Sequence, residues 1–205
     1  MIIDMQRDFL DPEGGCPQLL QLPPETLAQA RSIIPKVARL LAWARDRRIT
    51  IVYTREASRP DLSDLSASKR RRYENAGYPV GTLGKLGRLL VRDEPGCAVI
   101  GELAPQPGDL LYDKPEQSAF IGTSLAADLR ARDVTSLLFT GVTTPCCVLA
   151  SCRHAADLGF FPLLLEDCCA AFDPRDHDAA VRVLTSEGGA VGWVTSSDHI
   201  FRRDQ

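Results

Sequence analysis

The stretch LLFTGVTTPCCVLASCRHAAD, residues 137–157, decides the fold class of this chain. It begins as an apolar strand, turns at Gly141 and continues as a helix with Cys146 and Cys147 in its first turn. A helix N-terminus offers free N–H groups and the positive end of the helix dipole. Because that environment favours a thiolate, the stretch predicts that Cys147 is a nucleophile at a strand's C-terminal end. The alternative is that both cysteines are small buried apolar residues.

Strands and helices alternate along the rest of the chain. Apolar strand-like runs lie at 1–3, 49–53, 109–112, 136–140, 161–165 and 190–194. Helical patterns lie at 24–44, where Pro35 should kink or split the helix, and at 123–132 and 176–185. This alternation predicts an α/β fold with three αβα layers, in which a doubly wound, mostly parallel sheet of about six strands lies between helices. We find no linker and expect one domain spanning residues 1–205.

Two segments fit this pattern poorly. Residues 55–82 are polar and predict a long loop that acts as a lid, a binding loop or an interface. Residues 84–91 predict a short, weak helix or a turn. The basic run at 69–72 is typical of a solvated face or an interface rim.

Composition narrows the class of protein. The net charge of −3 over 205 residues gives no basic field for nucleic acid or a membrane surface. The seven cysteines include two adjacent pairs and show neither a disulfide framework nor zinc-ligand spacing. No apolar run approaches membrane-helix length, and no signal peptide is visible. We therefore expect a cytoplasmic protein without membrane or nucleic-acid partners.

Two further charged residues follow predicted strands, as Cys147 does. Asp4 comes directly after 1–3, and Lys114 comes just after 109–112. Since parallel strands end at one edge of a sheet, an acid, a cation and a thiol should meet there. Asp4 would accept the thiol proton and activate water, and Lys114 would stabilise the anions. Otherwise Asp4 tightens a turn and Lys114 is an exposed lysine.

Four segments carry a resemblance to a known family. IDMQRDF at 3–9, DKPEQSAFIGTSL at 113–125, TGVTTPCCVLASCRHAADLGF at 140–160 and LLLEDCCAAFDPRDHDAA at 163–180 resemble the isochorismatase-like cysteine hydrolases. The resemblance implies a Cys-Lys-Asp triad of Cys147, Lys114 and Asp4. It also implies a cis peptide bond before Thr143 and an oxyanion hole formed by the N–H groups of Thr143 and Cys147.

The same resemblance identifies the nucleophile and bears on the subfamily. Cys147 directly precedes Val148, as the family's nucleophile precedes a valine. Many relatives carry an acidic residue at the position of Pro145, which leaves the nucleophile in place. The segment 54–72 has no histidine, whereas nicotinamidases of the superfamily hold a metal with an Asp-x-His motif. The resemblance therefore implies neither a metal nor another cofactor.

The chain looks most like the branch that includes biuret and related ureido-compound amidohydrolases. This implies hydrolysis of a C–N bond in a small biuret- or triuret-like compound through a thioester, with release of ammonia. The alternatives are a ureidoacrylate-like or an N-carbamoyl-amino-acid-like substrate. Biuret-type relatives tend to carry glutamine at Glu187, and a carboxylate there would favour ligands rich in N–H donors or cations. Phe9 and Arg55 are further candidates for substrate binding.

Other classes of function remain open at this stage. Seven cysteines suit a thiol redox protein, although no C-x-x-C motif is present. A non-catalytic member of the same fold is a third possibility, but no member of the triad is missing. Relatives commonly associate, so we expect a homodimer or homotetramer.

Overall fold

Six strands form a parallel sheet in the order β5-β2-β1-β6-β7-β8, as the alternating pattern predicts. The computed structural model describes residues 1–202. The strands are β1 (Ile2–Ile3), β2 (Val52–Glu56), β5 (Leu110–Lys114), β6 (Ser136–Val142), β7 (Phe161–Ala170) and β8 (Trp193–Thr195).

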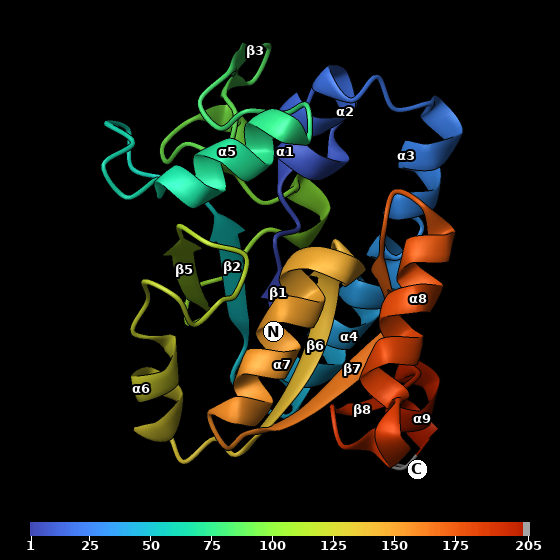
Figure 1. The fold of residues 1–205 in the computed structure, drawn as a ribbon. Helices are drawn as coiled ribbons and strands as arrows, with labels where there is room; N and C mark the ends of the chain where they lie inside the picture. The colour runs from blue at the N-terminus through green and yellow to red at the C-terminus, as the bar shows by residue number, and fades with distance from the viewer. Residues whose placement is uncertain (203–205) are drawn as a thin grey trace.

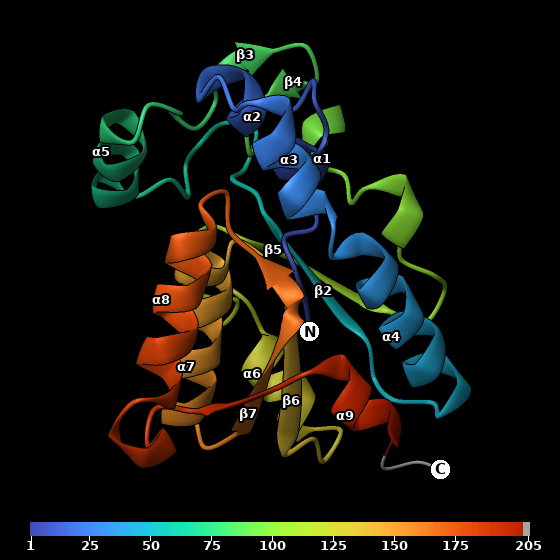
Figure 2. The ribbon, with the colours of Figure 1, turned by 90° about the vertical axis from the view of Figure 1, so that its right-hand side faces the viewer.

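Helices cover both faces of this sheet and produce three layers (Figures 1 and 2). One face carries α3 (Pro24–Arg31), α4 (Ile34–Asp46) and α9 (Ser197–Arg202). The other face carries α6 (Leu125–Arg130), α7 (Leu149–Asp157) and α8 (Pro174–Thr185). The three-layer α/β prediction is therefore confirmed.

Each face of the sheet has its own apolar core. Helix α4 buries one stripe at helical spacing, made of Ile34, Val37, Leu40, Leu41 and Ala44. Helices α6 and α7 bury Leu125, Leu129, Cys152 and Ala155 on the opposite side. Each large aliphatic side chain buried in this way contributes about 1.5–3 kcal/mol, and together they fix the sheet between its helices.

The strand order reverses between β1 and β6, and this point lies at the centre of the sheet. From β1 the chain winds outward to β2 and β5 on one side, and from β6 it winds to β7 and β8 on the other. The close approach of β1 and β6 requires Gly141, because a Cβ atom there would lie 2.0 Å from the Ile3 carbonyl oxygen. The crevice beyond such a switch point is the usual ligand site of an open α/β sheet.

The segment expected to be a long polar loop contains regular structure, so that prediction is wrong. Strand β2 continues to Glu56, and α5 (Ala67–Asn75) follows. The Ser66 hydroxyl oxygen accepts a hydrogen bond from the Lys69 N–H at 3.0 Å and caps α5. Helix α5 has few apolar residues, and tertiary contacts of Lys69 and Tyr73 hold it. Its apolar periodicity was therefore too weak to predict it.

Other differences are smaller. The helical pattern at 24–44 splits at Ser32 and Ile33 into α3 and α4, as Pro35 predicts. Residues 84–91 were expected to form a helix or turn, but β3 (Leu83–Gly84) and β4 (Gly87–Arg88) form a small antiparallel hairpin. Short helices complete the described chain: α1 (Arg7–Leu10), α2 (Gly15–Leu19), η1 (Pro95–Cys97), η2 (Gly101–Leu103), η3 (Thr144–Val148) and η4 (Glu187–Gly189). Within residues 1–202, no helix is long and apolar enough to cross a membrane.

Candidate active site

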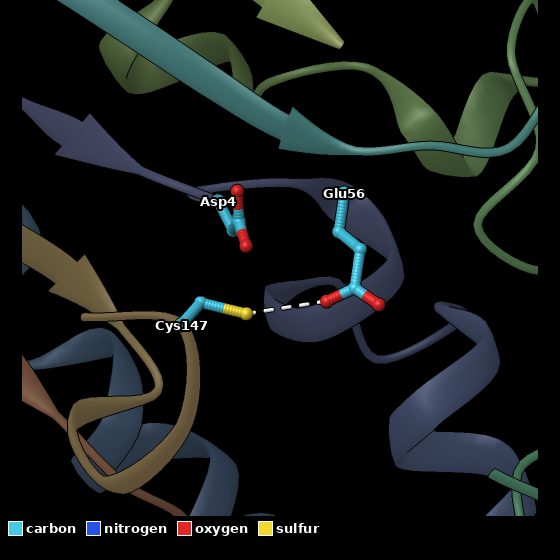
Figure 3. Close-up of side chains that lie close together, drawn as sticks. All are labelled: Asp4, Glu56 and Cys147. Atoms are coloured by element: carbon cyan, nitrogen blue, oxygen red, sulfur yellow. Dashed lines mark hydrogen bonds between the residues drawn. The ribbon is translucent and has the colours of Figure 1, made fainter. Parts of the chain in front are cut away.

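Four polar side chains meet at the C-terminal edge of the sheet. Asp4 follows β1, Glu56 ends β2, Lys114 ends β5 and Cys147 follows β6. All four are buried. The expected convergence of Asp4, Lys114 and Cys147 at one edge is present. Glu56 lies close to Asp4 and Cys147 as well (Figure 3).

Asp4 and Lys114 form a fully buried ion pair. The Lys114 Nζ atom lies 2.8 Å from Asp4 Oδ2 and 3.8 Å from Glu56 Oε2. Burial lowers the pKa of Lys114, but the nearby Asp4 carboxylate, Cys147 and Glu56 outweigh burial and raise it above its usual value. Lys114 is therefore an ammonium group at neutral pH. Its placement excludes the alternative of an exposed lysine.

Asp4 is held in an unusual backbone conformation. Its φ of 49° lies in the left-handed region, which aspartate and asparagine adopt more readily than most residues. The Thr54 hydroxyl donates a hydrogen bond to Asp4 Oδ1 at 2.7 Å. Oδ2 receives no well-aligned hydrogen bond within residues 1–202, although the Lys114 ammonium lies beside it. Asp4 Oδ2 is thus a buried acceptor available to a proton.

Cys147 lies on η3, a π-helical turn that joins β6 to α7. The peptide bond between Val142 and Thr143 is cis, as the family resemblance implies. The Cys147 Sγ atom donates a hydrogen bond to Glu56 Oε2 at 3.2 Å (Figure 3). Ligand atoms of Asp4, Glu56 and Cys147 all lie within 4.8 Å of one another. The thiol therefore faces two carboxyl groups.

The resting state of Cys147 differs from the thiolate expected at a helix N-terminus. Burial raises the pKa of the Cys147 thiol well above 9.0; Lys114 lowers it, and Asp4 and Glu56 raise it further. Burial dominates because Cys147 is largely shielded from water, so that the charged form is poorly solvated. These surroundings favour the thiol over the thiolate in the free protein.

Glu56 and Tyr73 are the part of the site that sequence reasoning missed, and Lys69 joins them. Lys69 Nζ lies 2.7 Å from Glu56 Oε1, and the Tyr73 hydroxyl donates to the same oxygen atom. Lys69 is fully buried, so the prediction of a solvated basic run is wrong for this residue, whereas Arg70, Arg71 and Arg72 are exposed. Ser66, three residues before Lys69, is a capping signal that indicates a helix here.

A small pocket opens onto the thiol. Its volume is about 230 Å³, and its lining includes Phe9, Glu56, Tyr73, Tyr78, Thr143 and Cys147. Phe9 and Thr143 therefore line the same pocket as Cys147, and their roles in substrate binding and in the oxyanion hole stay predictions.

Two predicted substrate-binding residues are not brought to this pocket. Arg55 donates to Asp113 at 2.7 and 3.0 Å and is absent from the pocket lining. Glu187 lies exposed on η4, also outside the lining. Within the described part of the chain, neither side chain faces the thiol.

The cluster of Asp4, Glu56 and Cys147 has the ligand types of a metal site, but its surroundings do not fit one. Two ammonium groups already neutralise the carboxylates, Lys114 at 2.8 Å from Asp4 and Lys69 at 2.7 Å from Glu56. A divalent cation between them would be repelled by both in a buried, low-dielectric environment. The charges therefore favour acid–base chemistry by the side chains themselves.

Comparisons with known proteins agree with this geometry. A ureidoacrylate amidohydrolase RutB of Rhizobium rhizogenes is 30% identical over 96% of this chain and 78% of its own length. The crystal structure of a cysteine hydrolase from Pseudomonas syringae pv. phaseolicola has a TM-score of 0.82 and 27% identity, covering 98% of this chain and 89% of that one. A pyrazinamidase of Pyrococcus horikoshii in complex with zinc has a TM-score of 0.70 and 25% identity, covering 95% and 96%.

The family comparison covers nearly the whole chain. Residues 1–198 match the Isochorismatase domain. This range includes every strand of the sheet and all four side chains at its C-terminal edge. The chain therefore belongs to the isochorismatase family.

Proposed function

We propose that this protein is a cysteine-dependent amidohydrolase that cleaves a C–N bond of a small carbamoyl or ureido compound through a thioester. The observation that carries the proposal is a buried ion pair of Lys114 and Asp4 in which an Asp4 carboxylate oxygen lies within 4.8 Å of the Cys147 thiol, beside a small pocket. The thiol is the nucleophile, the carboxylate is the base, and the ammonium group supplies positive charge.

The first half of the reaction makes the thioester. The Cys147 thiol proton moves to Asp4 while sulfur attacks the carbonyl carbon, and the carbonyl oxygen becomes an oxyanion. The N–H groups of Thr143 and Cys147 would bind this oxyanion. The C–N bond then breaks as the nitrogen takes the proton from Asp4, and the amine leaves. Burial favours the thiol form of Cys147, so in this proposal proton transfer to the nearby Asp4 carboxylate generates the nucleophile.

The second half of the reaction consumes water. Asp4, again a carboxylate, accepts a proton from a water molecule that attacks the thioester carbon. The C–S bond breaks, and the Cys147 sulfur recovers a proton from Asp4. Lys114 remains an ammonium group throughout and stabilises each anionic state. The sum is amide plus water giving acid plus amine.

Ureidoacrylate is the first candidate substrate. Relatives named ureidoacrylate amidohydrolase RutB match at about 30% identity over nearly the whole chain. These relatives favour ureidoacrylate over biuret, the substrate that the sequence resemblance placed first. The pocket volume of about 230 Å³ suits a molecule of this small size.

The test is ammonia release by the purified protein with ureidoacrylate, biuret, triuret, N-carbamoylsarcosine, malonamate and nicotinamide. We expect the largest kcat/KM with ureidoacrylate. A larger kcat/KM with biuret or triuret than with ureidoacrylate would favour a biuret-like substrate instead. Turnover of none of the six would contradict the proposed amidohydrolase activity.

A further inference from the structure

Glu56 is a second carboxylate at the thiol and has no part in the triad. It ends β2, and its Oε2 atom accepts the hydrogen bond of Cys147 Sγ at 3.2 Å. Figure 3 shows the Cys147 side chain pointing at this oxygen from the opposite side of the crevice. Glu56 also lines the pocket, so a molecule bound at the thiol reaches it.

The rest of Glu56 is fixed in place. Its other oxygen, Oε1, is occupied by Lys69 Nζ at 2.7 Å and by the Tyr73 hydroxyl, both from α5. Its backbone N–H donates to Gln6 Oε1 at 2.7 Å, and its carbonyl oxygen accepts from Gln6 Nε2 at 3.1 Å. Only Oε2 is therefore directed at the reacting atoms.

The charge of Glu56 is also fixed. Burial raises its pKa, but Lys69 and Lys114 outweigh burial and lower the pKa to about 2. A carboxylate that is so weak a base accepts hydrogen bonds at neutral pH and does not take up the proton. In the proposed mechanism Asp4 is the base, and Glu56 only accepts hydrogen bonds.

Oε2 loses its hydrogen-bond donor when the thiol proton leaves. Leaving a buried charged acceptor without a donor is costly, because water does not replace the lost hydrogen bond. The carbonyl carbon that bonds to sulfur carries the scissile nitrogen, and an N–H of that nitrogen can replace the S–H as donor to Oε2. A leaving oxygen cannot, because it carries no hydrogen.

We propose that Glu56 Oε2 accepts a hydrogen bond from the scissile N–H and so selects amides over esters, with Lys69 and Tyr73 as its positioning residues. The inference rests on the proposed cleavage of a C–N bond. Glu56 forms and breaks no covalent bond; it orients the nitrogen so that the nitrogen receives its proton from Asp4.

The test compares two molecules that transfer the same carbamoyl group. Ureidoacrylate has a leaving nitrogen that bears hydrogen, and 4-nitrophenyl carbamate has a leaving oxygen. For Glu56→Gln we expect kcat/KM to fall about 100-fold with ureidoacrylate and less than about 5-fold with the carbamate, since a charged acceptor becomes a weaker neutral one. Ammonia, formed when the carbamic acid product decomposes, is measured with both molecules, and 4-nitrophenolate is measured with the carbamate, with the rate of Cys147→Ser subtracted.

Two further variants keep the test clear. Glu56→Gln leaves the buried ammonium group of Lys69 without its carboxylate, and adding Lys69→Met removes that ammonium group. Activity lost because of the unpaired charge should return in the double variant, whereas the loss that is selective for the amide should remain. Glu116→Gln removes a different carboxylate contact of α5, to Arg72 at 2.9 Å, and should leave both rates within about 2-fold.

The outcomes separate the inference from the proposed function. An equal loss with both molecules in Glu56→Gln and in the double variant would overturn the role of Glu56 and leave the amidohydrolase standing. Equal rates for the wild type and Glu56→Gln on ureidoacrylate would also overturn it. Cleavage of neither molecule by the wild type would overturn the inference together with the proposed function.

Discussion

The Lys114 ammonium lies 2.8 Å from the Asp4 carboxylate, and both side chains are completely buried. Removing two such charges from water is expensive, and a buried pair of this kind is weak evidence for stability. The pair also lies beside the thiol of Cys147 at the switch point of the sheet. We infer that the pair is retained for the chemistry of the site.

Asp4→Asn tests the base. Asparagine tolerates the φ of 49° and can accept the Thr54 hydrogen bond, so the fold should persist. It cannot take the thiol proton, and we expect kcat with ureidoacrylate to fall about 10²–10⁴-fold. Ammonia release gives the rate, and thermal unfolding checks the fold. A folded variant with wild-type kcat would exclude Asp4 as the base.

Alkylation of Cys147 tests the resting thiol. Because burial raises its pKa well above 9.0, the group is protonated at neutral pH and becomes reactive only as pH rises. We expect iodoacetamide to modify Cys147 slowly at neutral pH and faster in alkaline solution, as measured by peptide mass spectrometry in the absence of substrate. A fast rate that does not change with pH would show a resting thiolate instead.

The decrease in the free energy of unfolding at low pH tests the charge of Glu56. Its pKa is lowered from 4.5 to about 2 in the folded chain, so its contribution is present above about pH 4.5 and is lost as pH falls towards 2. Loss proceeds at up to about 1.4 kcal/mol per pH unit. Urea unfolding should therefore show a shallower decline over this window for Glu56→Gln than for the wild type. Parallel declines would contradict an ionised, ion-paired Glu56.

Much of this arrangement follows from the sequence. Asp4, Lys114 and Cys147 each follow a strand-like run in the sequence. Because parallel strands end at the same edge of a sheet, the sequence predicts that these three residues meet there. The sequence did not predict the role of Glu56, because the apolar run ends at Tyr53. In the structure the strand continues through three polar residues that tertiary contacts hold in place. The burial of Lys69 was not predicted, because a basic run normally faces water. Only the folded chain shows the Glu56 carboxylate that neutralises Lys69.

Gly141→Ala tests the packing of β1 against β6. An added Cβ atom would lie 2.0 Å from the Ile3 backbone oxygen, so the strands must separate. We expect a loss of about 1–3 kcal/mol or more in the free energy of unfolding, measured in urea. Gly159→Ala is the matched control, since Gly159 also has a positive φ but no atom within 4 Å of the added carbon. Equal effects would show that backbone conformation, and not contact with Ile3, requires Gly141.

The most direct test of the central claim is ammonia release from ureidoacrylate by Cys147→Ser beside the wild type, with intact-protein mass spectrometry after acid quenching. We predict that the wild type releases ammonia and carries a substrate-derived acyl group on Cys147. The variant should do neither while unfolding at the same temperature. Undiminished ammonia release by the variant would contradict Cys147 as the nucleophile.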